Sequence, residues 1–120
     1  MNLDRGTIVL VGLDPTLGRE QQGTRPCVVV SDPDVTASAR FPMIAVVPVS
    51  GTAGEGALYP RLETRTGGLR RPSWALVDQL RSIDKRRVMR AFVGIDASEL
   101  TRIDEGLRSF LGLSTTPPGR

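Results

Sequence analysis

Apolar and β-branched residues gather in short runs along most of the chain, and the runs are separated by proline, glycine and aspartate. Runs of this length and composition are typical of β-strands bounded by turns. We expect six strands, over residues 7–13, 26–31, 43–49, 58–63, 73–81 and 89–95. Pro26 would stand first in its strand, where a missing N–H breaks no ladder bond, and Pro48 indicates a sheet edge or a bulge.

One late segment has the periodicity of a helix. Asp96, with Glu99 three residues later, has the form of a capping box at a helix start. Apolar residues then recur at helical spacing, at Leu100, Ile103, Leu107, Phe110 and Leu111. We therefore expect a helix over residues 96–112 that docks this stripe on the sheet, and shorter helical turns over residues 34–40 and 84–87. The pattern predicts a mainly β fold with helices, a small antiparallel barrel carrying a C-terminal helix.

A length of 120 residues allows one hydrophobic core. We expect residues 1–113 to form a single domain and residues 114–120 to form a flexible tail. No apolar run approaches the length of a membrane span, and the first residues lack the apolar core of a signal peptide. The single cysteine, Cys27, lies in an apolar run, which indicates a buried strand residue. These features predict a cytoplasmic protein without a membrane partner.

The basic residues are unevenly distributed. Residues 61–90 hold nine of the sixteen lysines and arginines with three acidic residues, whereas the rest of the chain has seven basic and ten acidic residues. A local cationic surface attracts polyanions through their phosphates. The alternative is a solvated face whose arginines pair locally. Five aromatic residues are few for a protein that binds single strands by base stacking.

The candidate chemistry is limited by the absence of histidine, so acid–base steps must use arginine, carboxylates or hydroxyls. No cysteine pair or histidine cluster suggests zinc, and no carboxylate spacing typical of Mg²⁺ is recognisable, so we expect neither metal nor cofactor. A polar loop with glycine at positions 18 and 23 leads to Arg25, and Pro26 favours an extended backbone at that arginine. A guanidinium placed in this way at the mouth of a barrel suits a phosphate.

Three segments carry a resemblance to a known family. They are Arg5-Gly6-Thr7-Ile8-Val9 through Leu13-Asp14-Pro15, the loop Gly18-Arg19-Glu20-Gln21-Gln22-Gly23-Thr24-Arg25-Pro26, and the stretch from Ser73-Trp74-Ala75 to Lys85-Arg86-Arg87. The loop is similar to the pattern G-x-E-Q-x-G-x-R-P. In this order and spacing the segments resemble the MazF/PemK family, the toxin endoribonucleases of type II toxin–antitoxin systems.

The resemblance implies an SH3-like barrel of the CcdB/PemK type that forms a homodimer. It also implies metal-independent cleavage of single-stranded messenger RNA to 2′,3′-cyclic phosphate and 5′-hydroxyl ends, which inhibits translation and growth. The implied protein partner is a cognate antitoxin whose disordered acidic segment covers the RNA groove. A DNA operator would be contacted only through that antitoxin.

The resemblance further implies catalytic roles for Arg25, Ser50 and Asp78. Arginine has a pKa above 12 and is a poor general base, so Arg25 would stabilise the charge of the phosphorane. Ser50 would bind a phosphate oxygen or relay a proton, with Thr52 as the alternative hydroxyl. Asp78 would act as general base or read RNA, and its alternative is an ion pair with Arg81 in the same strand.

Positions that resemble RNA contacts lie mainly in two loops, residues 14–25 and 50–60, which would read exposed bases by their edges. The RNA-binding candidates are Leu17, Glu20, Gln21, Gly51, Thr52 and Gln79. Glu20 could instead form a salt bridge with Arg25, and Gln79 could be a solvated strand residue. Gln22, where glycine is common in the family, and Arg19 at the loop tip depart from the pattern and leave the sequence preference open.

Two other functions remain as alternatives at this point. A non-enzymatic toxin of the same barrel type would inhibit DNA gyrase and would not need the Gly-x-Arg-Pro loop. A catalytically inert barrel would bind nucleic acid through the same basic surface without cutting it. Cleavage of naked RNA distinguishes the endoribonuclease from both.

Overall fold

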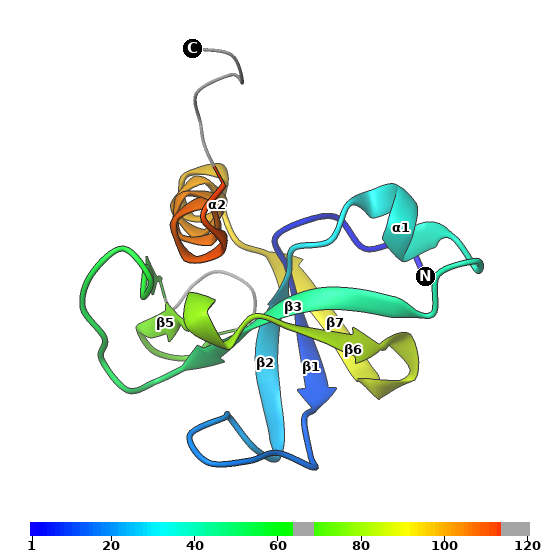
Figure 1. Cartoon of the computed structure of the whole chain (residues 1–120), viewed down its shortest axis with the longest axis horizontal. Helices are drawn as coiled ribbons and strands as arrows, with labels where there is room; N and C mark the ends of the chain where they lie inside the picture. The colour runs from blue at the N-terminus through cyan, green and yellow to red at the C-terminus, as the bar shows by residue number, and fades with distance from the viewer. Residues whose placement is uncertain (64–68, 114–120) are drawn as a thin grey trace.

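The computed structural model describes residues 1–63 and 69–113. Seven strands form one curled antiparallel sheet, and the C-terminal helix packs over one end of it (Figure 1). The strands are β1 (Thr7–Gly12), β2 (Thr24–Val29), β3 (Met43–Ser50), β4 (Arg61–Leu62), β5 (Ser73–Ala75), β6 (Arg81–Asp84) and β7 (Val88–Gly94). The helices are α1 (Pro33–Ala37) and α2 (Ala97–Leu111), with the 3₁₀ turns η1 (Val77–Gln79) and η2 (Lys85–Arg87). The predicted small barrel with a C-terminal helix is confirmed, whereas the predicted tail lies outside the described residues.

The sheet is organised around β3. Its order is β4-β5-β3-β2-β1-β7, with β6 also paired to β3. On one side β3 pairs with β2, through Cys27 opposite Pro48. On the other side its first half pairs with β6 and its last two residues with β5, through Ser50 opposite Trp74. This exchange of partners curls the sheet and brings the end of β3 close to β5 and η1.

The predicted strand over residues 73–81 is wrong, because η1 separates β5 from β6. Leu76 N–H donates to the Pro48 carbonyl at 2.8 Å, so Pro48 and η1 face each other where β3 changes partner. Proline has no N–H to continue the ladder there. Pro48 therefore lies neither at a sheet edge nor in a bulge. It lies in the central strand β3, between the stretch that pairs with β6 and the stretch that pairs with β5.

Two further strand boundaries differ from the predictions. The strand expected over residues 58–63 is reduced to β4. Pro26 is the third residue of β2 rather than the first, because the ladder with β1 continues to Thr24 opposite Gly12. Pairing with β3 is recorded only from Cys27 onward.

The core consists of two groups of buried aliphatic side chains. One group includes Ile8, Val28 and Ile103, and the other includes Val9 and Cys27. The buried position of Cys27 confirms its interpretation as a small core residue, and burial raises the pKa of its thiol to about 12. A largely aliphatic interior follows from the shortage of aromatic residues.

Helix α2 begins at the predicted capping box. The Asp96 side chain accepts from Glu99 N–H at 2.8 Å, and the Glu99 carboxylate accepts from Asp96 N–H at 3.2 Å. Ile103 is fully buried, but Phe110 and Leu111 are exposed, so only part of the predicted stripe docks on the sheet. No helix within the described ranges is long and apolar enough to cross a bilayer.

Candidate active site and nucleic-acid interface

The loop between β1 and β2 is shaped by its two glycines. Gly18 and Gly23 have φ values of 58° and 75°, in the left-handed region that favours glycine. Gly23 N–H donates to the Asp14 side chain at 3.1 Å, which closes the base of the loop. The Glu20 carboxylate accepts a hydrogen bond from Leu17 N–H and so orders the loop tip. The polar loop noticed in the sequence is therefore a structured element.

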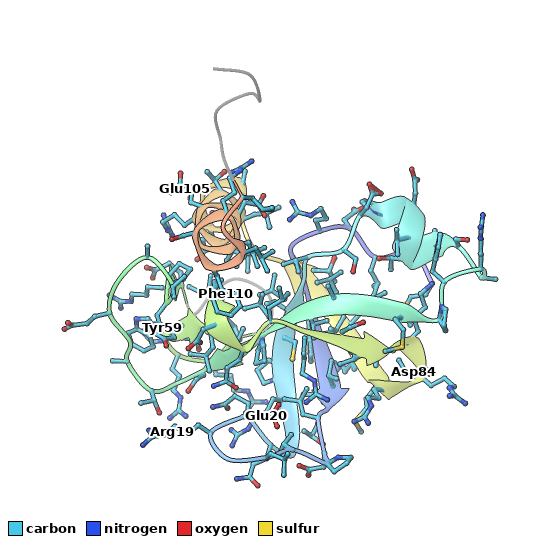
Figure 2. All side chains as sticks on the ribbon, in the orientation of Figure 1. Arg19, Glu20, Tyr59, Asp84, Glu105 and Phe110 are labelled. Atoms are coloured by element: carbon cyan, nitrogen blue, oxygen red, sulfur yellow. The ribbon has the colours of Figure 1, made fainter. Side chains whose placement is uncertain are left out.

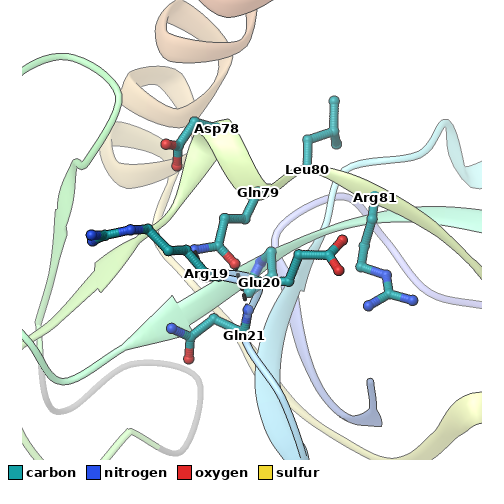
Figure 3. Close-up of a pocket in the computed structure, with 8 residues that line it drawn as sticks. Arg19, Glu20, Gln21, Asp78, Gln79, Leu80 and Arg81 are labelled. Atoms are coloured by element: carbon teal, nitrogen blue, oxygen red, sulfur yellow. Dashed lines mark hydrogen bonds between the residues drawn. The ribbon is translucent and has the colours of Figure 1, made fainter. Parts of the chain in front are cut away.

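Gln79 in η1 holds this loop in place. Its Oε1 accepts from Gln21 N–H at 2.7 Å, and its Nε2 donates to the Arg19 carbonyl at 3.2 Å (Figure 3). The alternative of a solvated strand residue is wrong, because Gln79 lies in a 3₁₀ turn and its amide binds loop backbone. Its predicted contact with a base edge would have to replace or supplement these bonds.

Arg25 lines a cavity of about 480 Å³, called here the Arg25 pocket. Its other polar lining residues are Ser50, Arg70, Arg71 and Ser73, and its apolar wall includes Leu10 and Phe92. Arg25 Nε donates to the Gln22 carbonyl at 3.0 Å, which orients the guanidinium. None of the described residues that line the pocket is acidic. The alternative salt bridge between Arg25 and Glu20 is absent from the ion pairs of the described residues.

A second cavity of about 500 Å³, the Tyr59 pocket, lies on the other side of Ser50. Tyr59 O–H donates to Asp78 Oδ2 at 2.6 Å, and this bond raises the pKa of the tyrosine. The alternative pair between Asp78 and Arg81 is not formed, since Arg81 Nη1 donates to the Leu13 carbonyl at 3.1 Å. Asp78 is thus held by a phenol at the rim of this pocket.

A third cavity of about 310 Å³ adjoins the Tyr59 pocket and is drawn in Figure 3; it is called here the Gln79 pocket. The two share Arg19, Gln21, Asp78 and Gln79 as lining residues, whereas the Tyr59 and Arg25 pockets share Ser50. The three cavities therefore follow one another along the protein surface. A row of connected cavities suits an extended strand better than a compact ligand.

The predicted site residues are distributed along this row. The Arg25 pocket contains Arg25, Ser50 and Gly51; the Tyr59 pocket contains Ser50, Thr52, Gln21, Asp78 and Gln79; the Gln79 pocket contains Glu20, Gln21, Asp78 and Gln79. Leu17 lines none of them and is 83% exposed at the loop tip. Arg25 and Asp78 lie in different cavities, with Ser50 common to both. Figure 2 shows Arg19 and Glu20 on the loop below Tyr59, and Asp84 well to the other side.

Several of the described basic side chains in residues 61–90 are held by neighbouring groups. Lys85 and Arg87 donate to backbone carbonyls, as Arg81 does. Arg86 pairs with Asp84 and lowers the pKa of that carboxyl to about 2. These four side chains are therefore held by local contacts, whereas Arg70 and Arg71 face the Arg25 pocket.

Sequence reasoning missed Tyr59, Arg70 and Arg71. Tyr59 comes near Asp78 only through the fold, because nineteen residues separate them. Arg71 had a usable signal: it precedes Pro72 as Arg25 precedes Pro26, and a residue before proline favours an extended backbone. Within residues 1–63 and 69–113, no group of three histidine, cysteine or acidic side chains is placed to hold a metal ion.

Comparison with known proteins identifies the family to which the chain is similar. A model of the family described as PemK-like, MazF-like toxin of type II toxin–antitoxin system matches residues 4–111. Endoribonuclease MazF9 of Mycobacterium tuberculosis is 38% identical over 115 residues, which cover 91% of this chain and 96% of that protein.

Solved structures agree with the sequence comparison. The crystal structure of MazF from Deinococcus radiodurans superposes with a TM-score of 0.78 at 28% identity, covering 94% of this chain and 99% of the other. A MazE–MazF crystal structure from the same organism gives a TM-score of 0.75 at 27% identity, with coverages of 95% and 99%.

Proposed function

The chain belongs to the PemK-like, MazF-like toxins of type II toxin–antitoxin systems, and from this premise we propose that it is an endoribonuclease that cleaves single-stranded messenger RNA without a metal ion. The observation that carries the proposal is that Arg25 and Ser50 line one cavity, whose described lining residues include no acidic side chain. A cationic cavity with a hydroxyl donor suits a phosphodiester group.

The reaction proposed is attack by the substrate's own 2′-hydroxyl on the adjacent phosphorus. The new P–O bond closes a 2′,3′-cyclic phosphate, the P–O5′ bond breaks, and the leaving oxygen takes up a proton to become a 5′-hydroxyl. The nucleophile belongs to the RNA, so the protein has to bind the phosphate and stabilise the phosphorane. It also has to accept the proton of the 2′-hydroxyl and supply a proton to the leaving 5′-oxygen. A metal ion is not required by this balance.

Arg25 would stabilise the negative charge that grows on the phosphate oxygens. Its Nε is engaged with the Gln22 carbonyl, which leaves the two terminal nitrogens to face the substrate. Ser50 Oγ accepts from Thr52 N–H at 3.1 Å, so the hydroxyl proton can be donated to a phosphate oxygen. Preorganised donors of this kind act most strongly where charge develops in the transition state.

Asp78 is the candidate acceptor of the 2′-proton. Its Oδ2 binds the Tyr59 phenol, and among the described residues no hydrogen bond is recorded for Oδ1. A strand that passes Ser50 would occupy both neighbouring cavities and bring its ribose between Arg25 and Asp78. The loops that carry Glu20, Gln21 and Thr52 would then read the bases on either side.

A homodimer and an antitoxin complete the proposed assembly. Strand β7 ends the sheet, and its Met89 and Val93 are 65% and 78% exposed, which leaves an apolar edge for a second copy to cover. The solved MazE–MazF structure is named as one of two proteins together. For this chain, the disordered acidic segment of a cognate antitoxin would carry the charge opposite to that of the arginines in the Arg25 pocket. Contact with operator DNA would pass through that antitoxin. Sedimentation of the purified chain tests the dimer.

The deciding experiment is cleavage of long single-stranded RNA in EDTA, with the ends mapped. Discrete cuts with cyclic-phosphate and 5′-hydroxyl ends are expected from the native protein. The Arg25→Ala protein should cut about 10²–10³ times more slowly. Intact RNA across varied pools would instead favour a gyrase inhibitor or an inert binding protein, and a gyrase supercoiling assay separates those two.

A matched Arg25→Lys variant tests the role of the guanidinium. Lysine keeps the positive charge but lacks the planar pair of donors, so RNA binding should persist while turnover falls sharply. Undiminished turnover would overturn the role assigned to Arg25.

A further inference from the structure

Arg71 enters the Arg25 pocket from a different part of the chain than Arg25. It precedes β5, whereas Arg25 lies in β2. Ser73 is buried and donates to the Arg71 carbonyl at 3.0 Å, which fixes the backbone at this arginine. Pro72 restricts the same backbone to extended conformations. The side chain therefore starts from a well-defined position.

The guanidinium of Arg71 lies directly on the backbone of Gly51. A β-carbon built on Gly51 would be 2.8 Å from both Nε and Nη2 of Arg71, which is closer than such atoms approach. Gly51 has no left-handed backbone angle that would itself demand glycine. The absence of a side chain at position 51 thus gives the guanidinium room beside Ser50.

No described acidic residue forms an ion pair with Arg71. Among the described residues, no side-chain hydrogen bond or ion pair is recorded for Arg71, and its side chain is exposed. Arg25, Arg70 and Arg71 therefore place three positive charges around one cavity, and none of its described lining residues is acidic. Concentrated positive charge of this kind attracts a polyanion.

We propose that Arg71 binds the phosphate next to the scissile one and holds the RNA across Ser50. This rests on the proposed ribonuclease function and adds a second phosphate contact to it. The cavity of about 480 Å³ has room for more than a single phosphate group. Since Arg25 and Ser50 take the scissile phosphate, the guanidinium on Gly51 is placed for a neighbouring phosphate of the same strand. Arg71 is thus a substrate-binding residue that contributes equally to the ground state and the transition state.

The first test compares Arg71→Gln with Arg40→Gln. Arg40 lies beyond the opposite end of β3 and is exposed, so its variant loses one charge away from the cavities. Arg71→Gln should raise KM about tenfold, the scale of one charge-assisted contact, and leave kcat unchanged. Arg40→Gln should change neither. A fall in kcat at constant KM, or equal behaviour of the two variants, would overturn the proposal.

The second test needs no catalysis and so separates this inference from the proposed function. Binding of a fluorescent single-stranded DNA of mixed sequence, which has no 2′-hydroxyl to react, is measured over a range of salt concentrations. Loss of one phosphate contact should weaken binding by Arg71→Gln and reduce the slope of log affinity against log salt by about 0.7. If the slope for Arg71→Gln equals that of the native protein, Arg71 does not contact a phosphate, even if the native protein cuts RNA. Absence of cutting by the native protein counts only against the proposed function.

The third test uses Gly51→Ala to move the guanidinium while keeping its charge. The added methyl displaces the end of a flexible side chain, so the fold should persist, as thermal unfolding will show. Gly51→Ala should weaken DNA binding about as much as Arg71→Ala. In the Arg71→Ala background the same methyl should have little further effect. A full additional loss in that background would show that the methyl acts on the nucleic acid directly and would overturn the placement of Arg71.

Discussion

Arg25 and Ser50 come from two neighbouring antiparallel strands, β2 and β3, and meet at one cavity. The ladder between β2 and β3 ends at Cys27 opposite Pro48, and Arg25 and Ser50 each lie two residues beyond that pair. Both side chains line one cavity. Both residues are therefore carried by strands of one sheet, which holds side chains more accurately than a loop does.

Ser50→Ala should lower turnover far more than Thr52→Ala. Ser50 lines both the Arg25 and the Tyr59 pockets, whereas Thr52 lines only the latter. Loss of one hydrogen-bond donor to developing charge typically reduces the rate about 10²–10³-fold. Cleavage of a defined RNA by the two variants decides which hydroxyl serves the reaction. A larger loss for Thr52→Ala would assign the role to that residue.

The hydrogen bond between Tyr59 and Asp78 leads to a prediction about the pH at which Tyr59 titrates. The phenol donates to the carboxylate, so the pKa of Tyr59 is raised above its usual value of 10.0. The bond therefore stabilises the fold below that value and is lost as the pH rises through the raised pKa. Tyr59 is the only tyrosine, so the ultraviolet absorbance of phenolate reports this group alone. Asp78→Asn should shift the titration to lower pH, and an identical titration would show that the bond is absent in solution.

The strands β1, β2 and β3 and the β1–β2 loop were predictable because their signals are local. The apolar runs of β1, β2 and β3 are separated by proline, aspartate and glycine, and the capping box marks α2. The division of the run over residues 73–81 depends on β3, whose Pro48 cannot continue the ladder. Strand propensity within that run contains no information about a partner that lies elsewhere in the chain.

The candidate site was predictable only in part, for the same reason. Arg25 stands in a recognisable loop, whereas Arg71 reaches the same cavity by packing on Gly51, twenty positions away. The excess of basic residues over positions 61–90 also combines arginines that have two different kinds of contact. Arg81 and Arg87 bind backbone carbonyls near the base of the β1–β2 loop, while Arg71 faces the cavity. Composition records the number of arginines but not what surrounds each of them.

Cys27 should be unreactive in the folded protein. The thiol is fully buried, and burial raises its pKa to about 12, so the reactive thiolate is scarce near neutral pH. A thiol reagent should label the native protein very slowly and the denatured protein at once. The chain has one cysteine, so total labelling measures this site without ambiguity. Rapid labelling under native conditions would mean that β2 opens easily or that the thiol is accessible.

Gly106→Ala should destabilise the protein although alanine is the better helix former. A β-carbon at this position would lie 2.8 Å from the Ala57 carbonyl oxygen and 3.2 Å from Val77 Cγ2. Overpacking of this kind costs about 1–3 kcal/mol, against a gain in helix propensity of about 1 kcal/mol. A backbone oxygen cannot rotate away, so α2 must move relative to η1, which carries Asp78 and Gln79. We therefore expect a lower melting temperature together with weaker binding of single-stranded DNA.

Ser109→Ala provides the matched control for that substitution. Ser109 lies on the same helix and is exposed, so its replacement tests helix propensity without a steric change. Thermal unfolding of the three proteins should rank Ser109→Ala at or above the native protein and Gly106→Ala below it. If Gly106→Ala matched the native protein in stability, the close packing of α2 on the segment before β4 would not persist in solution. Helix α2 would then have no part in positioning η1, and the binding loss expected for Gly106→Ala should also be missing.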